Sequence, residues 1–326
     1  MTKISIFTDS AFAIFSANNI LKGSEQKADL LTISEFWVTN LADNAYLNPI
    51  LIEKWPRGFQ RYLPINTKRS TSQQNILNYL QKTQPDEIWF HEIYSDQWNW
   101  IALIYKQLFP SRKIRLLPES FLNAISHPIT STQYRNQKIK ASLAKSYSPF
   151  KGEWIGLDAQ FNHSSLVENI LLPQYFPHPY KEDKVQYFNY NITQDTIKPE
   201  RAILVEQALL DRGFATESQL KDMYAKLTED WEKHHIKDIS IAPHPRAKKR
   251  DFAFTNLPLF ERQSPFLEED IAQYGFGHIY SSYSMIFLSS IHLQGRFVSF
   301  GLGGFENFPE QNSYKRILSK MPVEFI

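Results

Sequence analysis

The feature that most constrains the fold is a regular alternation of short apolar runs with longer amphipathic runs. In the amino-terminal part of the chain, the short runs are typical of buried strands, and the longer ones carry apolar residues at helical spacing. The strand-like runs are 4–8, 30–38, 87–90 and 113–117, and the helix-like runs are 11–22, 72–81 and 98–108. Strands separated by helices of this length indicate βαβ units, and therefore a parallel sheet covered by helices.

The same alternation resumes in the carboxyl-terminal part. Its strand-like runs are 201–205, 237–242, 278–280 and 296–300, and its helix-like runs are 216–233, a run that begins at Ser264, and 283–293. The stretch between the two parts is rich in proline and glycine and weakly periodic, which is typical of a linker. We therefore predict an α/β protein with two Rossmann-like lobes, residues 1–150 and 200–326, whose parallel sheets face a central cleft, and an interdomain crossing over residues 151–199.

Composition narrows the class of protein. The 326 residues suffice for two domains, and 42% apolar with 21% charged residues is an ordinary globular composition. The chain has no cysteine, which excludes disulfides and thiolate metal sites and favours a reducing compartment. No signal-peptide pattern and no membrane-spanning apolar run is present, so we expect a cytoplasmic protein.

Charge gives a weaker indication of partners. A net charge of +2 is too small to indicate nucleic-acid binding. Basic clusters at 145–151 and 246–250 are compatible with a solvated surface, with an anionic substrate, or with peripheral contact at the cytoplasmic face of the inner membrane.

A histidine between two prolines follows the apolar run 239–242. Pro243 and Pro245 restrict the backbone around His244, and Arg246 adds a cation directly afterwards. Histidine at a strand end can donate to a phosphate oxygen or act as an acid near neutral pH, although a structural histidine in a turn is the alternative. Two further His-Pro pairs, His127-Pro128 and His178-Pro179, lack this context of strand and cations.

A cluster of hydroxyls follows the next strand-like run. Ser281, Ser282 and Ser284 stand where an apolar helix is predicted to begin. Helix amino termini bind anions, and serine hydroxyls add donors, but serine is also favoured there as a structural cap. Because both motifs lie at the carboxyl ends of strands, where open α/β sheets bind ligands, they predict a phosphate-binding site.

Carboxylates at the carboxyl end of the amino-terminal sheet are candidates for a general base. Glu119 follows the strand-like run 113–117, and His91-Glu92 ends the run 87–90 as a competing choice. The sequence contains no dinucleotide fingerprint, phosphate loop, metalloprotease motif, nucleophile elbow or Asp-x-Asp pair. We therefore expect a metal-independent reaction without a cofactor.

The order of these motifs resembles that of the bacterial sialyltransferases and polysialyltransferases of the GT-B type. Those families carry an acidic motif, then His-Pro, then a serine or serine pair, which here would be Glu119, His244-Pro245 and Ser281-Ser282. The segments 8–22 and 203–209, the latter with Gln207, are also similar to the group. The acidic motif departs from the family pattern, since Pro118-Glu119-Ser120 stands where the family has two acids and a glycine.

The resemblance implies an inverting transfer of sialic acid, or a similar acidic sugar, from its CMP ester to a hydroxyl of a cell-surface glycan such as lipooligosaccharide or capsule. Glu119 would take the acceptor proton, and His244 would stabilise the departing phosphate. Pro245, Arg246, Gln207, Ser281 and Ser282 would bind the donor, in the carboxyl-terminal lobe. The alternatives are a transferase with another nucleotide-activated donor and a catalytically silent glycan- or nucleotide-binding protein.

Overall fold

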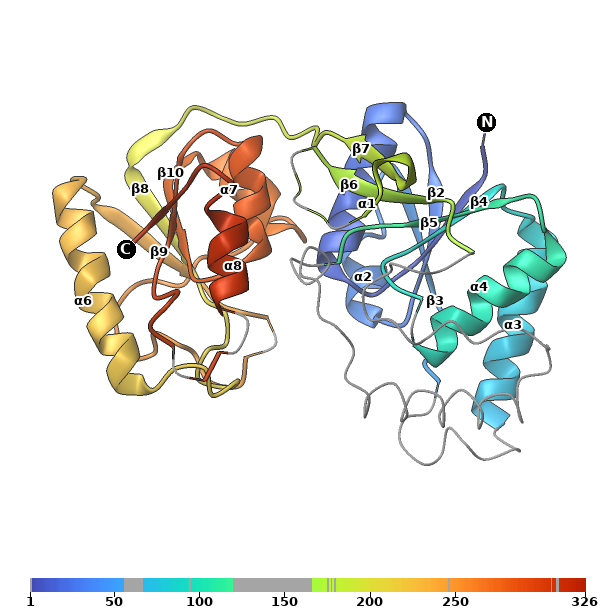
Figure 1. Cartoon of the computed structure of the whole chain (residues 1–326), viewed down its shortest axis with the longest axis horizontal. Helices are drawn as coiled ribbons and strands as arrows, with labels where there is room; N and C mark the ends of the chain where they lie inside the picture. Colours follow the sequence, from blue (N-terminus) through green and yellow to red (C-terminus); the bar gives the residue numbers. More distant parts are fainter. Residues whose placement is uncertain are drawn as a thin grey trace. The chain divides into compact units, whose positions relative to one another are not determined.

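A computed structural model of the chain describes residues 2–55, 67–93, 95–119, 166–174, 176, 178, 180–245, 247–305, 307–308 and 311–326 (Figure 1). The chain divides into two compact units. The first comprises Met1–Gln174 and His178–Asn191, and the second comprises Tyr175–Pro177 and Ile192–Ile326. Within the described part of the chain, the helices are all too short or too polar to cross a membrane.

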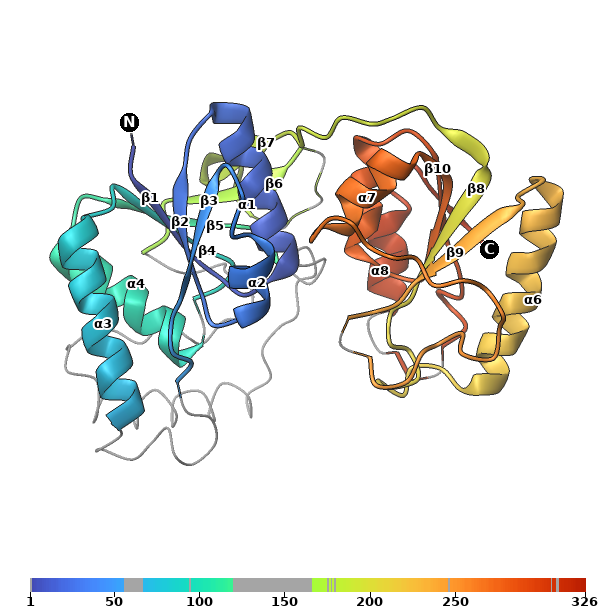
Figure 2. The ribbon, with the colours of Figure 1, turned by 180° about the vertical axis from the view of Figure 1, so that it is seen from behind.

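The first unit is built on a seven-stranded parallel sheet with the order β3-β2-β1-β4-β5-β6-β7. Its strands are β1 (Ile4–Phe7), β2 (Ala28–Thr32), β3 (Leu47–Leu51), β4 (Glu87–Phe90), β5 (Lys113–Leu116), β6 (Asn169–Pro173) and β7 (Val185–Phe188). Its helices are α1 (Ala11–Ser24), α2 (Glu35–Asn40), α3 (Thr67–Thr83), α4 (Asp96–Leu108) and the short 3₁₀ helix η3 (Glu182–Lys184). Helices α1 and α2 lie on one side of the sheet, and α3 and α4 on the other (Figure 2).

Burial on both faces explains the composition of the central strands. All four residues of β1 are buried, as expected for a parallel strand covered by helices on both sides. Stacked Phe7 and Phe90, with ring centroids 5.4 Å apart, and the neighbouring Trp98 form an aromatic core beneath the carboxyl ends of β1 and β4. The chain leaves β1 toward β2 and β3, and returns to β4 on the other side of β1. Open α/β sheets bind ligands at such a reversal, which here lies at the carboxyl ends of β1 and β4.

The second unit contains a five-stranded parallel sheet with the order β12-β11-β10-β8-β9. Its strands are β8 (Lys198–Val205), β9 (Asp238–Ala242), β10 (Phe276–Ser281), β11 (Arg296–Ser299) and β12 (Val323–Phe325). Its helices are α6 (Glu217–Lys233), α7 (Leu267–Tyr274), α8 (Gln311–Leu318) and the 3₁₀ helix η4 (Met285–Ile291). Helix α6 lies on one side of the sheet, and α7 and α8 on the other (Figures 1 and 2). In this sheet β9 lies on one side of β8 and β10 on the other, so the strand order reverses between β8 and β10.

The predicted α/β class with two parallel sheets is confirmed, and the predicted helix 216–233 is α6, which begins with a capping box. There, the Thr216 hydroxyl accepts from the Gln219 amide N–H, and the Gln219 side chain accepts from the Thr216 N–H. The predicted strand 30–38 is wrong in its second half, because the chain turns at Ser34 and begins α2. The predicted helix 283–293 is the shorter 3₁₀ helix η4.

The predicted boundaries of the lobes also need correction. Residues 151–199 were expected to form an interdomain crossing, but β6 and β7 lie within this range and extend the first sheet. Prolines at the end of β6 and after it hide the strand signal, and β7 is an edge strand with no fully buried residue. The same reason hides β3, an edge strand that contains Pro49.

Candidate functional site

The loops at the carboxyl end of the second sheet bring together the motifs found in the sequence. The strand register places Ala242, Val205 and Ser281 side by side on β9, β8 and β10. Because neighbouring strands are about 4.8 Å apart, the backbones of Ala242 and Ser281 are about 10 Å apart across β8. His244 follows two residues after Ala242, and Ser282 follows directly after Ser281. The His-Pro turn and the serine cluster therefore share one edge of the sheet.

His244 stands in a tight turn at the end of β9. Its ring is half-buried, its neighbours Pro243 and Pro245 are exposed, and its carbonyl oxygen accepts from the Ala247 N–H at 3.1 Å. Pro245 has no N–H to offer a phosphate, so it serves the site by fixing the turn. Arg246, predicted as a donor-binding residue, lies outside the described residues.

Two carboxylates lock the His-Pro loop to the loop that follows β8. The buried Asp251 carboxylate accepts from the amide N–H groups of Gln207 and Leu210, both at 3.1 Å. In the opposite direction, Asp211 accepts from the amides of Lys248 and Lys249. Charge-assisted hydrogen bonds of this kind are among the stronger ones in proteins. These hydrogen bonds join the segment directly after the His244 turn to the loop that follows β8.

Glu206 adds a third anchor at the end of β8. Its carboxylate is buried, accepts from the Phe252 N–H at 2.9 Å, and lies 3.6 Å from the Arg250 guanidinium. Burial raises the pKa of Glu206, although the Phe252 amide and Arg250 oppose that rise. Glu206 thereby supports the loop that presents His244.

Gln207, a predicted donor-binding residue, connects the β8 loop to the serine segment. Its side-chain amide donates to the Glu206 carbonyl at 2.8 Å, and its own carbonyl accepts from the Tyr283 hydroxyl at 3.3 Å. These contacts are internal to the lobe, so the structure gives Gln207 a role in holding the two loops together.

The two predicted serines differ in their hydrogen bonding. Ser281 is fully buried, and its hydroxyl donates to the Val205 carbonyl at 2.8 Å, which makes it a link between β10 and β8. The Ser282 hydroxyl is equally buried and has no hydrogen-bond partner among the described residues. The half-buried Ser284 hydroxyl accepts from the Ile286 N–H at 3.3 Å, at the start of η4. Of the two predicted serine ligands, only Ser282 has an unmatched donor.

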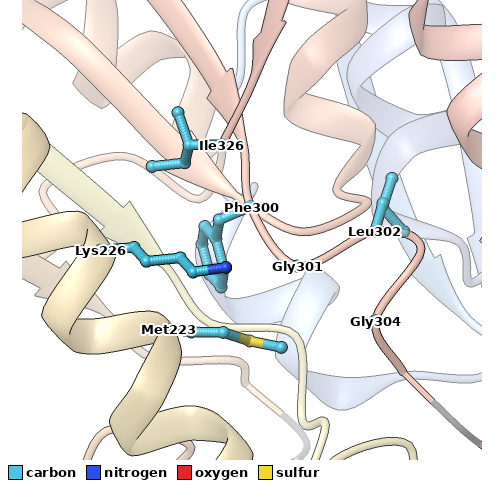
Figure 3. A pocket seen from close by; sticks show the side chains of 7 residues that line it. All are labelled: Met223, Lys226, Phe300, Gly301, Leu302, Gly304 and Ile326. Carbon is cyan, nitrogen blue, oxygen red and sulfur yellow. The ribbon is translucent and has the colours of Figure 1, made fainter.

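A pocket lies one strand further along the same edge. It has a volume of about 160 Å³ and is lined by Met223, Lys226, Phe300, Gly301, Leu302, Gly304 and Ile326. Figure 3 shows the Lys226 amine extending from α6 toward the ring of Phe300. Phe300 follows β11, and its N–H donates to the Ser281 carbonyl at 3.0 Å, so the pocket adjoins the serine cluster.

Sequence reasoning missed this pocket. The glycines after β11 were visible as a break, but the α6 side chains that complete the lining are about 75 residues distant in sequence. Gly301 has a φ of +75°, and a Cβ there would meet the Met223 methyl carbon at 2.7 Å. Glycine at this position lets the loop pack against α6 and closes one side of the pocket.

The carboxyl edge of the first sheet pairs the candidate His91 with Asp9, a half-buried carboxylate that sequence reasoning missed. Asp9 follows β1, His91 follows β4, and the Asp9 Oδ1 lies 3.5 Å from the His91 Nε2. Burial lowers the pKa of His91 to about 4, although Asp9 and the Phe7 backbone oppose this shift. The imidazole is therefore neutral at physiological pH. The available signal was a carboxylate placed directly after the first strand.

The other two candidate bases lie on the same edge but differ in their surroundings. Glu92 is buried, and its carboxylate accepts from the Ser95 N–H at 2.9 Å, where it caps the start of α4. Glu119 is half-buried and lies three residues beyond β5. The structure thus gives Glu92 a structural role. Nowhere in the described residues do three or more histidine, aspartate or glutamate side chains cluster as a metal ion would require.

Comparison with known proteins identifies the fold. Neither a protein-family model nor a curated protein matches the sequence. Among solved structures, the spinosyn forosaminyltransferase SpnP aligns over 100% of this chain and 85% of its own length, with a TM-score of 0.56 at 9% identity.

The calicheamicin glycosyltransferase CalG4 aligns over 100% of this chain and 85% of its own, with a TM-score of 0.52 at 10% identity. The spinosyn rhamnosyltransferase SpnG, solved with thymidine diphosphate, covers 100% of this chain and 86% of its own, with a TM-score of 0.51 at 12% identity. The chain has the GT-B fold. At these identities the likeness concerns the fold alone. The chemistry of this chain has to be inferred from its own residues.

Proposed function

We propose that this protein is an inverting glycosyltransferase whose donor is the CMP ester of sialic acid or of a similar acidic sugar. The observation that carries the proposal is the shared edge of the second sheet, where His244 and the unmatched Ser282 hydroxyl flank the end of β8. The GT-B fold supports a transfer between a nucleotide-activated sugar and an acceptor hydroxyl. The acceptor is proposed to be an oligosaccharide of the cell surface, and the protein to act in the cytoplasm.

His244 and Ser282 have the chemistry that a departing phosphate requires. When the bond between the anomeric carbon and the phosphate oxygen breaks, negative charge builds up on the phosphate. An imidazole N–H and a serine hydroxyl stabilise that charge more in the transition state than in the ground state, which accelerates the reaction. Because Ser282 has no exposed surface, the segments that cover it would open on binding of the donor.

The hydrogen bonds within the loops favour a donor with one phosphate over one with two. A diphosphate is commonly cradled by free backbone amides. Here the amides of Gln207, Leu210, Lys248 and Lys249 already donate to Asp251 and Asp211. These four amides are therefore not free to cradle a diphosphate, which favours the smaller CMP leaving group.

The pocket beside the serine cluster suits a single flat ring. Its volume of about 160 Å³ is close to that of an engineered cavity that binds benzene. Met223 and Phe300 offer apolar contacts, and the Lys226 amine can donate to a ring carbonyl. A pyrimidine base fits this description better than a purine, which has two fused rings.

The principal alternative is another nucleotide-activated donor, since the similar SpnG was solved with thymidine diphosphate. Thermal-shift titrations with CMP, CDP, TDP, UDP and GDP separate the two proposals, because a ligand that binds only the folded state raises its stability. We expect selective stabilisation by CMP. Selective stabilisation by TDP or UDP would replace the CMP donor with a diphosphate donor, and a response to none would overturn the proposed function. Binding without turnover would identify a silent binding protein.

Turnover is tested with His244→Ala and a matched control. We expect this variant to lower the rate of CMP release from CMP-N-acetylneuraminic acid by about 100-fold or more. His178 belongs to another His-Pro pair, and its ring hydrogen-bonds the Tyr187 hydroxyl at 2.8 Å. It has no proposed role in donor binding. His178→Ala should keep the wild-type rate. Equal rates for the His244 variant and wild type would refute the role of His244, and loss of activity in EDTA would refute metal independence.

A further inference from the structure

A half-buried carboxylate, Asp9, lies at the carboxyl end of the first sheet, where the strand order reverses. Asp9 lies two residues beyond β1, one of the two strands that flank the reversal of strand order. Its side chain is 33% exposed, and its one charged contact among the described residues is His91, on the other flanking strand. Open α/β sheets bind ligands at this point of reversal.

His91 is packed in the core and faces Asp9. The imidazole is 4% exposed and packs edge-on against Trp98, with ring centroids 6.0 Å apart. Its Nε2 faces the Asp9 carboxylate, and the Phe7 backbone offers the ring a further hydrogen bond. A neutral imidazole in this position can donate its Nε2–H to Asp9 and orient the carboxylate.

The competing carboxylates on this edge are less suited to proton transfer. Glu92 is buried and committed to the Ser95 amide at the start of α4. Glu119 lies three residues beyond β5, which is one strand further from the point of reversal than β4. Asp9 thus combines partial exposure with a place at the reversal itself.

We propose that Asp9 is the general base that accepts the acceptor proton, and that His91 is the positioning residue that orients the Asp9 carboxylate. This inference rests on the proposed glycosyl transfer. In the step, the acceptor O–H bond breaks and its proton passes to an Asp9 carboxylate oxygen. The acceptor oxygen forms a bond to the anomeric carbon, while the bond from that carbon to the phosphate oxygen breaks and its electron pair leaves with CMP.

The test compares turnover with donor binding in the full-length protein. Turnover is CMP release from CMP-N-acetylneuraminic acid with lactose as the probe acceptor, and donor binding is the thermal shift with CMP. We expect Asp9→Asn to lower kcat by about 100-fold or more while the CMP shift stays at the wild-type value. Asp43→Asn, which removes an exposed carboxylate in the same unit, is the matched control and should leave both unchanged.

Two variants of His91 distinguish positioning from packing. His91→Gln keeps an N–H that can reach Asp9, and His91→Leu keeps an apolar volume without any donor. We expect kcat to be largely retained in the glutamine variant and to fall at least 10-fold in the leucine variant, with KM unchanged in both. A purely structural His91 would instead give two variants with equal kcat that differ only in stability.

The outcomes separate this inference from the proposed function. If wild-type protein releases no CMP above the blank, the proposed transfer fails, and the assignment of Asp9 fails with it. If wild type turns over and Asp9→Asn retains more than a tenth of its kcat, only the assignment of Asp9 is overturned. If Glu119→Gln lost turnover while Asp9→Asn stayed active, Glu119 and not Asp9 would be the general base.

Discussion

Replacing Ser282 with alanine should improve folding and impair binding. The Ser282 hydroxyl is fully buried and has no hydrogen-bond partner among the described residues. A buried unpaired hydroxyl costs about 1–3 kcal/mol, part of which returns when alanine removes it. We therefore expect Ser282→Ala to raise the free energy of unfolding by up to about 1 kcal/mol.

The same substitution removes a donor to the phosphate. A hydrogen bond to a charged group contributes about 1.5–3 kcal/mol. Since about 1.4 kcal/mol corresponds to a factor of ten, the Kd for CMP should rise by about 10- to 100-fold. Gains in stability at the expense of binding are typical of functional positions.

Ser281→Ala is the matched comparison, because it removes the neighbouring hydroxyl from the same strand end. The Ser281 hydroxyl donates to the Val205 carbonyl at 2.8 Å, so its loss should lower the free energy of unfolding by about 1–2 kcal/mol. Affinity for CMP should change much less than in Ser282→Ala. Urea unfolding gives the stabilities, and calorimetric titration with CMP gives the affinities. If Ser282→Ala were destabilised as much as Ser281→Ala, or bound CMP as well as wild type, the reasoning would be refuted.

Two further predictions concern the second unit. Gly301→Ala should destabilise the protein more than Gly213→Ala. Both glycines have a positive φ, +75° and +66°, which costs about 1 kcal/mol or more for alanine, but of the two only Gly301 would place the new Cβ within 3 Å of other atoms. Equal urea midpoints for the two variants would contradict this steric argument. Burial would raise the pKa of Asp230, but hydrogen bonds from Arg296 and Tyr280 outweigh it and hold that pKa below its ordinary value of 3.8. The folded state then gains stability from Asp230 above this ordinary value and loses it as pH falls through the lower folded pKa. Arg296→Gln should accordingly lower the free energy of unfolding by about 3–5 kcal/mol at pH 7. The difference in urea midpoint between this variant and wild type should narrow at pH 3. A difference that does not change with pH would show that the ion pair with Asp230 is not the cause of the destabilisation.

Local signals predicted the elements that have a local cause. The capping box at the start of α6 depends on only four consecutive residues, Thr216 to Gln219, and the structure contains it. Buried central strands such as β1 and β10 were also predicted, because their apolar runs end abruptly in polar residues. The edge strands β3 and β7 were missed, since both are partly exposed and β3 contains a proline, so neither shows a continuous apolar run.

The sequence by itself determined the α/β class and the placement of His244 and the serine cluster at strand ends, because periodicity and chain breakers act within a few residues. Only the tertiary structure decided the strand order that puts β8 between these motifs. It also distinguished the bonded Ser281 from the unmatched Ser282, and it brought Asp9 within 3.5 Å of His91. Such features depend on strand register and burial among residues far apart in the chain, and no local pattern of residue types encodes them.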